Sequence, residues 1–423
     1  MKRLFDDENE DPPSPRLRRA GDDEDHLSVS KGVKTPLKVM HIITRFIRGG
    51  AQENTLLTVA GLAKRPDYEV SLVTGPGLGP EGDMLDDAMK SGAKVIVVDA
   101  MRRAIHPWRD WVSYWALRRL MREMKPDIVH THSSKAGILG RWAARAERVP
   151  KIVHSIHGLP FHDYERWWLN RLYIALERNC ARCTDRIICV ADAMTDKAVA
   201  AGVAPREKFV TVYSGMEVEP FLHAGEERDA VRKALGIAPD AVVAGVVARI
   251  SPLKGHEFVI RAAPAIVARN PGVKFLFVGD GHIRREMEEL ARGLGVFEHI
   301  VWAGLRPYRE IPELVGAMDL VVHTSLREGL ARVLPQALLA GVPVVSYDVD
   351  GAKEVVIPGK TGWLVGAESI EGLSGAVCEA LGDLGHAKAL ALAGRELCQK
   401  HFPAEVMVEE IDREYKRLFE GKV

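Results

Sequence analysis

Short apolar runs of strand length alternate with helical patterns along almost the whole chain, and this alternation limits the folds open to it. Strands are expected at 38–44, 69–74, 94–98, 127–132, 151–155 and 185–190, and again at 241–249, 274–279, 299–304, 319–323 and 342–346. Strands separated by helices form parallel sheets with helices on both faces. The sequence therefore predicts doubly wound α/β domains, which bind ligands at the carboxyl ends of their strands.

The stretch 323–356 contains the most informative of these strand, loop, helix and strand units. Its loop carries Glu328 and Gly329, and its helix is expected to begin near Ala331. Pro335 fits such a helix only in the first turn, where backbone N–H groups have no intrahelical partner. The N-terminus of this helix therefore points out of the carboxyl edge of the sheet, where its unpaired N–H groups and positive dipole end favour an anion.

Cationic side chains lie in two strand-to-helix loops of this half of the chain. Arg332 falls in the first helical turn, where a cation opposes the helix dipole. Arg249 and Lys254 lie upstream, after another buried strand and just before the next helix. The cations indicate a di-anion such as a diphosphate, and Glu328 beside them suits a polyhydroxylated group. Together they outline a nucleotide sugar.

At these residues the chain resembles glycosyltransferase family 4, the group 1 transferases. The resemblance covers roughly residues 37–418, and its landmarks occur in the order found in the family. They are Gly49-Gly50-Ala51-Gln52, His130-Thr131-His132, His157-Gly158, Arg249 with Lys254-Gly255, Gly279-Asp280-Gly281 and Glu328-Gly329.

The resemblance implies the GT-B fold, in which two Rossmann-like doubly wound domains face a cleft. Residues 1–36 alternate charge blocks with prolines and are expected to form a disordered tail. We expect an N-terminal acceptor domain at 37–215, a C-terminal nucleotide-sugar donor domain at 216–402, and a helix at 403–423 that crosses back to the first domain.

The resemblance also assigns residues to the reaction, which would be a retaining, metal-independent transfer to a hydroxyl acceptor. Expected catalytic residues are Glu328, His157, Arg249 and Lys254. Expected donor-binding residues are Gly50, Arg249, Lys254, Gly279, Gly281, Glu328, Gly329, Leu330, Arg332 and Gln336. The family has a second glutamate where this chain has Gln336, so an uncharged amide oxygen would accept the bond from the ribose hydroxyls.

No metal or other cofactor is expected. His130, His132, His154 and His157 gather at the ends of two strands, but strand alternation is expected to turn only some of them toward one point. The pair Asp348 and Asp350 suits a divalent ion in another glycosyltransferase fold. Here the cationic loops supply that charge.

Composition excludes several classes of function. The chain has 423 residues and no net charge, so its totals do not indicate a nucleic-acid partner. It has neither a hydrophobic signal core nor an apolar run long enough to span a bilayer, and its five cysteines are expected to be packed thiols in a reducing compartment. We expect a cytoplasmic protein, at the inner face of the membrane if the acceptor is lipid-linked.

Two helical stretches carry most of the tryptophans, and either can dock on a membrane. In 106–125, Trp108, Trp111 and Trp115 recur at helical spacing, and we favour packing of this stripe against the sheet. Adjacent Trp167 and Trp168 cannot both point inward from one helix, so packing on the sheet and docking on a membrane both stay open for this stretch. If the acceptor is lipid-linked, peripheral membrane contact is expected at these two residues.

Alternatives remain at this stage. A GT-B nucleotide-sugar epimerase would need acid and base carboxylates at the sugar, which neither Gln52 nor Gln336 supplies. A non-catalytic nucleotide-sugar-binding protein would bind donor without turnover. The favoured function is hexosyl or N-acetylhexosaminyl transfer from a UDP- or GDP-sugar in polysaccharide or glycolipid synthesis.

Overall fold

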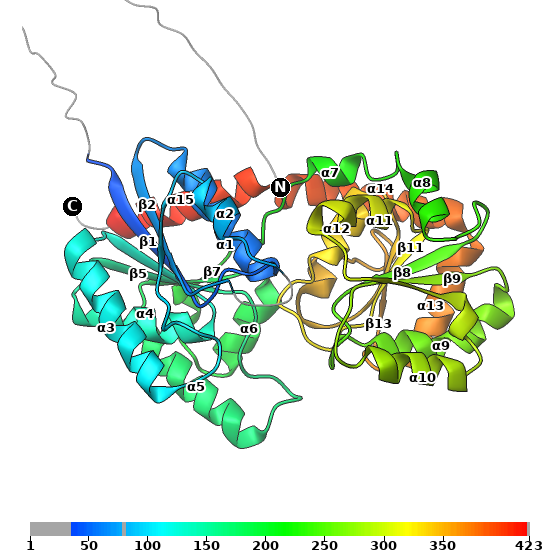
Figure 1. Cartoon of the computed structure of the whole chain (residues 1–423), viewed down its shortest axis with the longest axis horizontal. Helices are drawn as coiled ribbons and strands as arrows, with labels where there is room; N and C mark the ends of the chain where they lie inside the picture. The colour runs from blue at the N-terminus through cyan, green and yellow to red at the C-terminus, as the bar shows by residue number, and fades with distance from the viewer. Residues whose placement is uncertain (1–34, 78–81, 421–423) are drawn as a thin grey trace, which may run out of the picture. The chain divides into compact units, whose positions relative to one another are not determined.

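A computed structural model describes residues 35–77 and 82–420 of the chain. These residues form two sheets in which neighbouring strands pair in parallel (Figure 1). The predicted doubly wound α/β architecture is therefore confirmed. The expected N-terminal tail, up to residue 34, lies outside the described residues.

The first sheet has the strand order β3-β2-β1-β4-β5-β6-β7. Its strands are β1 (Leu37–Ile43), β2 (Tyr68–Thr74), β3 (Lys94–Val97), β4 (Ile128–His132), β5 (Lys151–Ile156), β6 (Arg186–Cys189) and β7 (Phe209–Thr211). The accompanying helices are α1 (Gly50–Ala63), α2 (Leu85–Met89), α3 (Pro107–Met124), α4 (Ser134–Ala146), α5 (Trp167–Ala181) and α6 (Asp192–Ala200).

The second sheet has the order β10-β9-β8-β11-β12-β13. Its strands are β8 (Val243–Val247), β9 (Lys274–Val278), β10 (Ile300–Gly304), β11 (Leu320–His323), β12 (Val344–Tyr347) and β13 (Trp363–Val365). The helices of this part are α7 (Glu219–Leu222), α8 (Arg228–Ala234), α9 (His256–Arg269), α10 (Arg284–Gly293), α11 (Ile311–Gly316), α12 (Val333–Leu339), α13 (Ile370–Gly382) and α14 (Leu384–His401).

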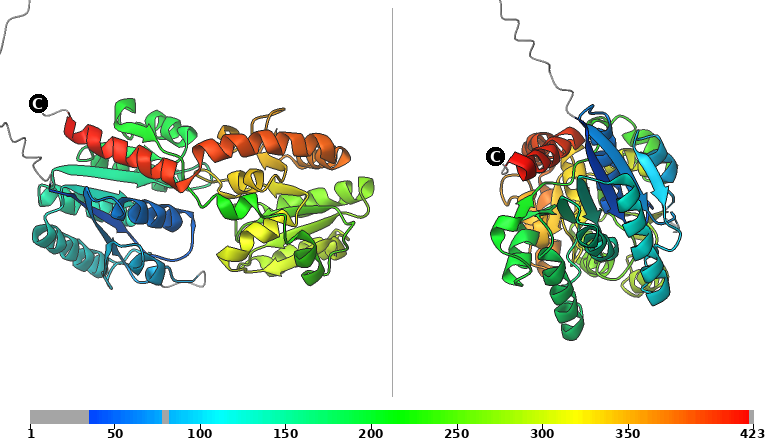
Figure 2. Two further views of the ribbon diagram at one scale, coloured as in Figure 1. Left: turned by 90° about the horizontal axis from the view of Figure 1, so that it is seen from above. Right: turned by 90° about the vertical axis from the view of Figure 1, so that its left-hand side faces the viewer.

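The last helix, α15 (Ala404–Glu420), packs against α1 and the first sheet rather than the second (Figures 1 and 2). Val408, Ile411 and Tyr415 of α15 share an apolar cluster with Val39 and Ile43 of β1. Successive strand residues face opposite sides of a sheet, and the intervening Met40 and Ile42 pack in a different cluster with residues of α3 and α4. Each face of the first sheet is thus covered by its own helical layer.

Both sheets reverse their strand order beside their first strand, which fixes where the functional loops lie. The reversal falls between β1 and β4 in the first sheet and between β8 and β11 in the second. Loops that leave the carboxyl ends of such strands diverge to opposite faces and leave room for a ligand. The glycine pair after β1, the cationic loop after β8 and the Glu328 loop after β11 all leave from these points.

Candidate active site

Lys254 and Glu328 bring together the loops that follow β8 and β11. Nζ of Lys254 forms an ion pair with Oε1 of Glu328, and Nε2 of His323 lies 3.7 Å from the same oxygen. Burial alone would raise the pKa of Glu328, but the charge of Lys254 and the contact with His323 outweigh it and lower this pKa to about 2. Glu328 is therefore a carboxylate at neutral pH, as the proposed role at a sugar requires.

The Glu328 loop is fixed by residues that follow β12. The backbone N–H of Glu328 donates to Oδ2 of Asp350 at 2.7 Å, and Asp350 also forms an ion pair with Lys197 of α6. Glu354, a few residues further on, accepts hydrogen bonds of 2.9 Å from the backbone N–H groups of Asp192 and Ala193 at the N-terminus of α6. The sequence offers Asp350 as a possible metal ligand, and in the structure it has these protein partners.

Gly279 and Gly281 are required by the close approach of two loops. A Cβ on Gly279, whose φ is 137°, would lie 2.1 Å from the carbonyl oxygen of Ala248, and one on Gly281 would lie 1.9 Å from that of Ile250. The loop after β9 is thereby held against the loop after β8, next to the exposed Arg249. Direct contact of these glycines with a donor stays a prediction.

Arg332 lies at the N-cap of α12 and contacts residues of the first half of the chain. It pairs with Glu53 of α1 at 3.1 Å and donates to Oγ of Ser214 at 3.1 Å and to the carbonyl of Gly215 at 3.0 Å. Its Cδ would lie 3.0 Å from a Cβ on Gly50. Sequence reasoning assigned Arg332 to a donor anion and missed Glu53. The donor role of Arg332 and Gly50 remains a prediction.

The other expected donor-binding residues lie in or beside α12. Leu330 and Gln336 are both 6% exposed, and Leu330 belongs to an apolar cluster that includes Met194 of α6. A Cβ on Gly329 would lie 2.4 Å from the carbonyl oxygen of His157, and Arg327 donates to the carbonyl of Leu159. The Glu328 loop therefore packs directly on the loop that carries His157.

His157 follows β5 and is half-buried. Burial, helped by the charge of Arg332, lowers the pKa of His157 to about 4, so its imidazole is neutral at pH 7. A pocket beside it is lined by Ala51, Ser133, Ser134, Ser155, His157 and Gly158 among others, and so by the first turns of α1 and α4. A neutral imidazole in this position can exchange hydrogen bonds with a hydroxyl group.

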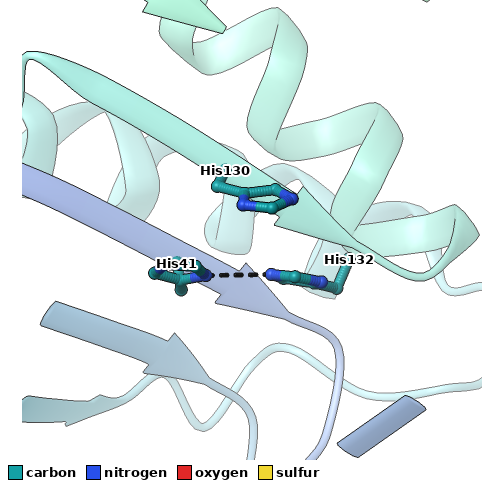
Figure 3. A group of neighbouring side chains, drawn as sticks. All are labelled: His41, His130 and His132. Atoms are coloured by element: carbon teal, nitrogen blue, oxygen red, sulfur yellow. Dashed lines mark hydrogen bonds between the residues drawn. The ribbon is translucent and has the colours of Figure 1, made fainter. Parts of the chain in front are cut away.

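Three fully buried histidines of β1 and β4 lie close together (Figure 3), and one of them, His132, contacts His157. In the described part of the chain, ring nitrogens of His41, His130 and His132 lie within 4.8 Å of one another. Nδ1 of His41 lies 3.0 Å from Nε2 of His132. Sequence reasoning missed His41, because only the pairing of β1 with β4 places it opposite His130.

Three neutral imidazoles are a donor set that zinc accepts. Here each ring nitrogen already has a protein partner: His130 bonds Ser155 at 2.7 Å and Tyr415 at 2.5 Å, His132 bonds His157 at 3.1 Å, and His41 lies 3.5 Å from the Tyr415 hydroxyl. The cluster is thus satisfied as a hydrogen-bonded network.

Comparison with known families matches both halves of the chain. The family model "Glycosyl transferases group 1" matches residues 227–397, and "Glycosyl transferase 4-like domain" matches residues 49–215. The first match contains the loops of Lys254 and Glu328, and the second contains Gly50 and His157.

Individual relatives and solved structures agree with these matches. UDP-Gal:alpha-D-GlcNAc-diphosphoundecaprenol alpha-1,3-galactosyltransferase of Escherichia coli is 28% identical over 356 residues, which are 84% of this chain and 90% of that protein. Anabaena HepE, crystallised in complex with UDP and glucose, superimposes with a TM-score of 0.76 at 20% identity, over 90% of this chain and 99% of that one. Sucrose-phosphate synthase from Thermosynechococcus elongatus gives 0.76 at 19% identity, over 91% and 100%. At such identities the structural likeness establishes the fold, and the expected GT-B architecture is confirmed.

Proposed function

We propose that this chain, which belongs to the group 1 glycosyltransferases, moves a hexosyl or N-acetylhexosaminyl group from a UDP- or GDP-sugar to a hydroxyl of a saccharide or lipid-linked acceptor. The Escherichia coli relative is named for a UDP-galactose donor and a diphosphoundecaprenol-linked acceptor, and HepE was crystallised with UDP and glucose. Both descriptions support a nucleotide-sugar donor, and the lipid-linked acceptor of the Escherichia coli relative supports a role in polysaccharide or glycolipid synthesis.

The pairing of Lys254 with Glu328 at the carboxyl edge of the second sheet carries this proposal. Negative charge grows on the nucleoside diphosphate as its bond to the sugar breaks. Lys254, Arg249 and the N-terminal N–H groups of α12 would stabilise that charge. Glu328, kept ionised by Lys254, would orient the sugar and support positive charge on its anomeric carbon.

A retaining, metal-independent course is part of the proposal. Cations already present in the loop after β8 would take the place of a divalent ion at the diphosphate. The acceptor hydroxyl would attack from the leaving-group side, with a phosphate oxygen receiving its proton. Gln336 would bond the ribose through its amide oxygen, with less strength than a carboxylate.

His157 and its pocket would bind the acceptor. The carbonyl of His157 is packed on Gly329, next to Glu328, and this closeness supports placing the imidazole in the same site as the donor residues. Its neutral form would bond an acceptor or donor hydroxyl without adding a charge.

Membrane contact at Trp167 and Trp168 also stays a proposal. Among the described helices, none has both the length and the apolar character that a membrane span requires. We place the protein in the cytoplasm, at the inner face of the membrane, where a lipid-linked acceptor would be presented.

A thermal-shift series with UDP, GDP, ADP and their sugar conjugates, with and without EDTA, tests the donor site, because a ligand that binds only the native state raises the melting temperature. A rise with one nucleotide family that survives EDTA is expected. NMR of the transferred product should show that the anomeric configuration of the donor is kept. Donor binding without transfer to varied acceptors would favour a non-catalytic protein, and release of an isomerised free sugar would favour an epimerase.

A further inference from the structure

The helices α3, α4 and α5 carry six of the chain's eight tryptophans, and all six side chains reach solvent. Exposed fractions are 66% for Trp108, 53% for Trp111, 42% for Trp115, 36% for Trp142, 71% for Trp167 and 48% for Trp168. Exposed tryptophans gathered in this way mark an interaction surface. We call this outer surface of the three helices the tryptophan face.

The expectation that the α3 stripe packs against the sheet is wrong. The residues of α3 that are buried on the sheet are Ser113, Leu117 and Met121. At 100° per residue, the tryptophans lie about 150° around the helix from that stripe. They recur at helical spacing because they form a second, outward stripe.

The outward stripe of α3 is ordered by contacts among its own members. The rings of Trp108 and Trp111 stack with centroids 5.1 Å apart, and Trp111 meets Trp115 edge-on at 6.1 Å. The guanidinium of Arg118 lies 4.5 Å from the centroid of Trp115. The result is a continuous aromatic ridge flanked by cations.

The same part of the chain is strongly basic. Residues 102–182 contain sixteen Lys and Arg against seven Asp and Glu, a formal charge of +9 in a chain whose total is zero. All of these residues are described, and ten arginines and one lysine among them are exposed, against only Glu123 and Asp163 on the acidic side. Of the other acids, Glu147 is paired with Arg118 and Arg122, and Glu177 with Arg141.

We propose that the tryptophan face is a docking surface for a bilayer rich in anionic phospholipids. Tryptophan rings suit the headgroup level of a bilayer, and exposed arginines suit its phosphates. Ile105, which is 82% exposed and precedes α3 by two residues, and Leu172 of α5, which is 47% exposed, add aliphatic side chains. Aliphatic side chains insert into lipid but do not stack on bases, which favours a membrane over a nucleic acid.

Docking through this face would bring the acceptor to the site. The segment 157–166 joins His157 to the start of α5, so the His157 pocket opens beside a helix that rests on the bilayer. This inference deepens the proposed function by locating the arrival of a lipid-linked acceptor, while lipid binding itself needs no donor or turnover.

Co-flotation of the full chain with vesicles tests the docking. Vesicles of phosphatidylglycerol and phosphatidylcholine should bind at least tenfold more protein than vesicles of phosphatidylcholine alone, and high salt should weaken the binding. Joint substitution Trp108→Ala, Trp111→Ala and Trp115→Ala should lower binding to the anionic vesicles at least tenfold. A matched control replaces Leu294, Leu305 and Leu392, which are exposed on the second half of the chain, by alanine and should bind as the wild type does.

Equal binding to both vesicle types, no binding to either, or undiminished binding of the triple tryptophan variant would overturn the proposal. Tighter binding to a single-stranded oligonucleotide than to the anionic vesicles would overturn it in favour of nucleic acid. Melting temperatures of the variants establish that they are folded. The nucleotide thermal-shift series on the same proteins reports separately on the donor site, so failure of that site leaves the vesicle result standing.

Discussion

Nδ1 of His132 lies 3.1 Å from Nε2 of His157, and the two rings stack with centroids 5.4 Å apart. From His132 the contacts continue to His41 and to the hydroxyl of Tyr415 on α15. Burial lowers the pKa of each of these histidines, so each ring is neutral and carries a single N–H. The direction of one hydrogen bond in this series therefore fixes the direction of the next. The series connects α15 to the proposed acceptor pocket.

We predict which nitrogen of His157 carries the proton. The hydroxyl proton of Tyr415 should go to the nearer ring, His130, and its oxygen would then accept from Nε2 of His41. In that arrangement His132 donates to His41 and His157 donates to His132, which leaves Nδ1 of His157 as an acceptor. Nitrogen-15 NMR of the histidines distinguishes the two tautomers. A protonated Nδ1 on His157 would show that the hydrogen bonds of this series run in the opposite direction.

Tyr415→Phe should lower the free energy of unfolding by about 1–3 kcal/mol, because it leaves buried ring nitrogens of His130 and His41 without their partner. Tyr347→Phe is the matched control, since its buried hydroxyl has no hydrogen-bond partner among the described residues. Urea unfolding of both variants measures the difference. Equal costs for the two substitutions would mean that the Tyr415 hydroxyl contributes nothing specific.

Stability should fall as the pH is lowered below about 6.5. The pKa of His41 is lowered to about 3 and that of His157 to about 4 by burial, and those of His130, His132 and His154 lie well below 6.5 for the same first reason. Below pH 6.5 the histidines of the unfolded chain bind protons, whereas the same histidines stay neutral in the folded chain. Acid therefore favours unfolding.

The stability that the neutral buried histidines contribute is fully present above pH 6.5. It is lost progressively as the pH falls from 6.5 through the pKa values of these histidines in the folded protein. Unfolding free energies between pH 7 and pH 5 should fall less steeply in His41→Asn than in the wild type. The exposed His282→Asn serves as the control. An identical pH slope in all three proteins would contradict the assignment of neutral buried rings.

Lys254→Met should lower kcat/KM for transfer by about 10²–10³-fold, the usual cost of removing one group that stabilises developing negative charge. Glu328 would also lose its nearest cation, so its pKa should rise. Lys274→Met is the control, because Lys274 lies at the amino end of β9, at the opposite edge of the sheet. Full activity in Lys254→Met with an unchanged melting temperature would remove Lys254 from the mechanism.

Arg332→Met should destabilise the fold by about 3–5 kcal/mol, since it leaves the buried carboxylate of Glu53 without its cation. Glu53→Gln in the same chain should recover much of that loss, and a double-mutant cycle gives the coupling. Transfer activity then separates the two roles of Arg332. If the double variant regains stability but not donor affinity, Arg332 also contacts the donor; recovery of both would limit it to pairing with Glu53.

The sequence predicted the sheets and the cationic loops well because their signals are local. Strand positions fell within a residue or two for most strands, and Pro335 lies in the first turn of α12, as expected. The edge strands β7 and β13 were missed because three residues are too short to show a period. The pairs of Glu53 with Arg332, His41 with His132 and Asp350 with Glu328 were missed because each depends on contacts between residues distant in sequence.

The position of α15 has a consequence for the order in which the chain matures. A ribosome completes β1 to β7 long before it adds residues 404–420. During that time one apolar face of the first sheet is not covered by Val408, Ile411 and Tyr415. Chains of this size usually fold their amino-terminal part first. Here the core of the first sheet can be completed only when α15, the last helix to be synthesised, packs on it. The second sheet has its own cluster of buried side chains, so its core can be complete before that of the first sheet.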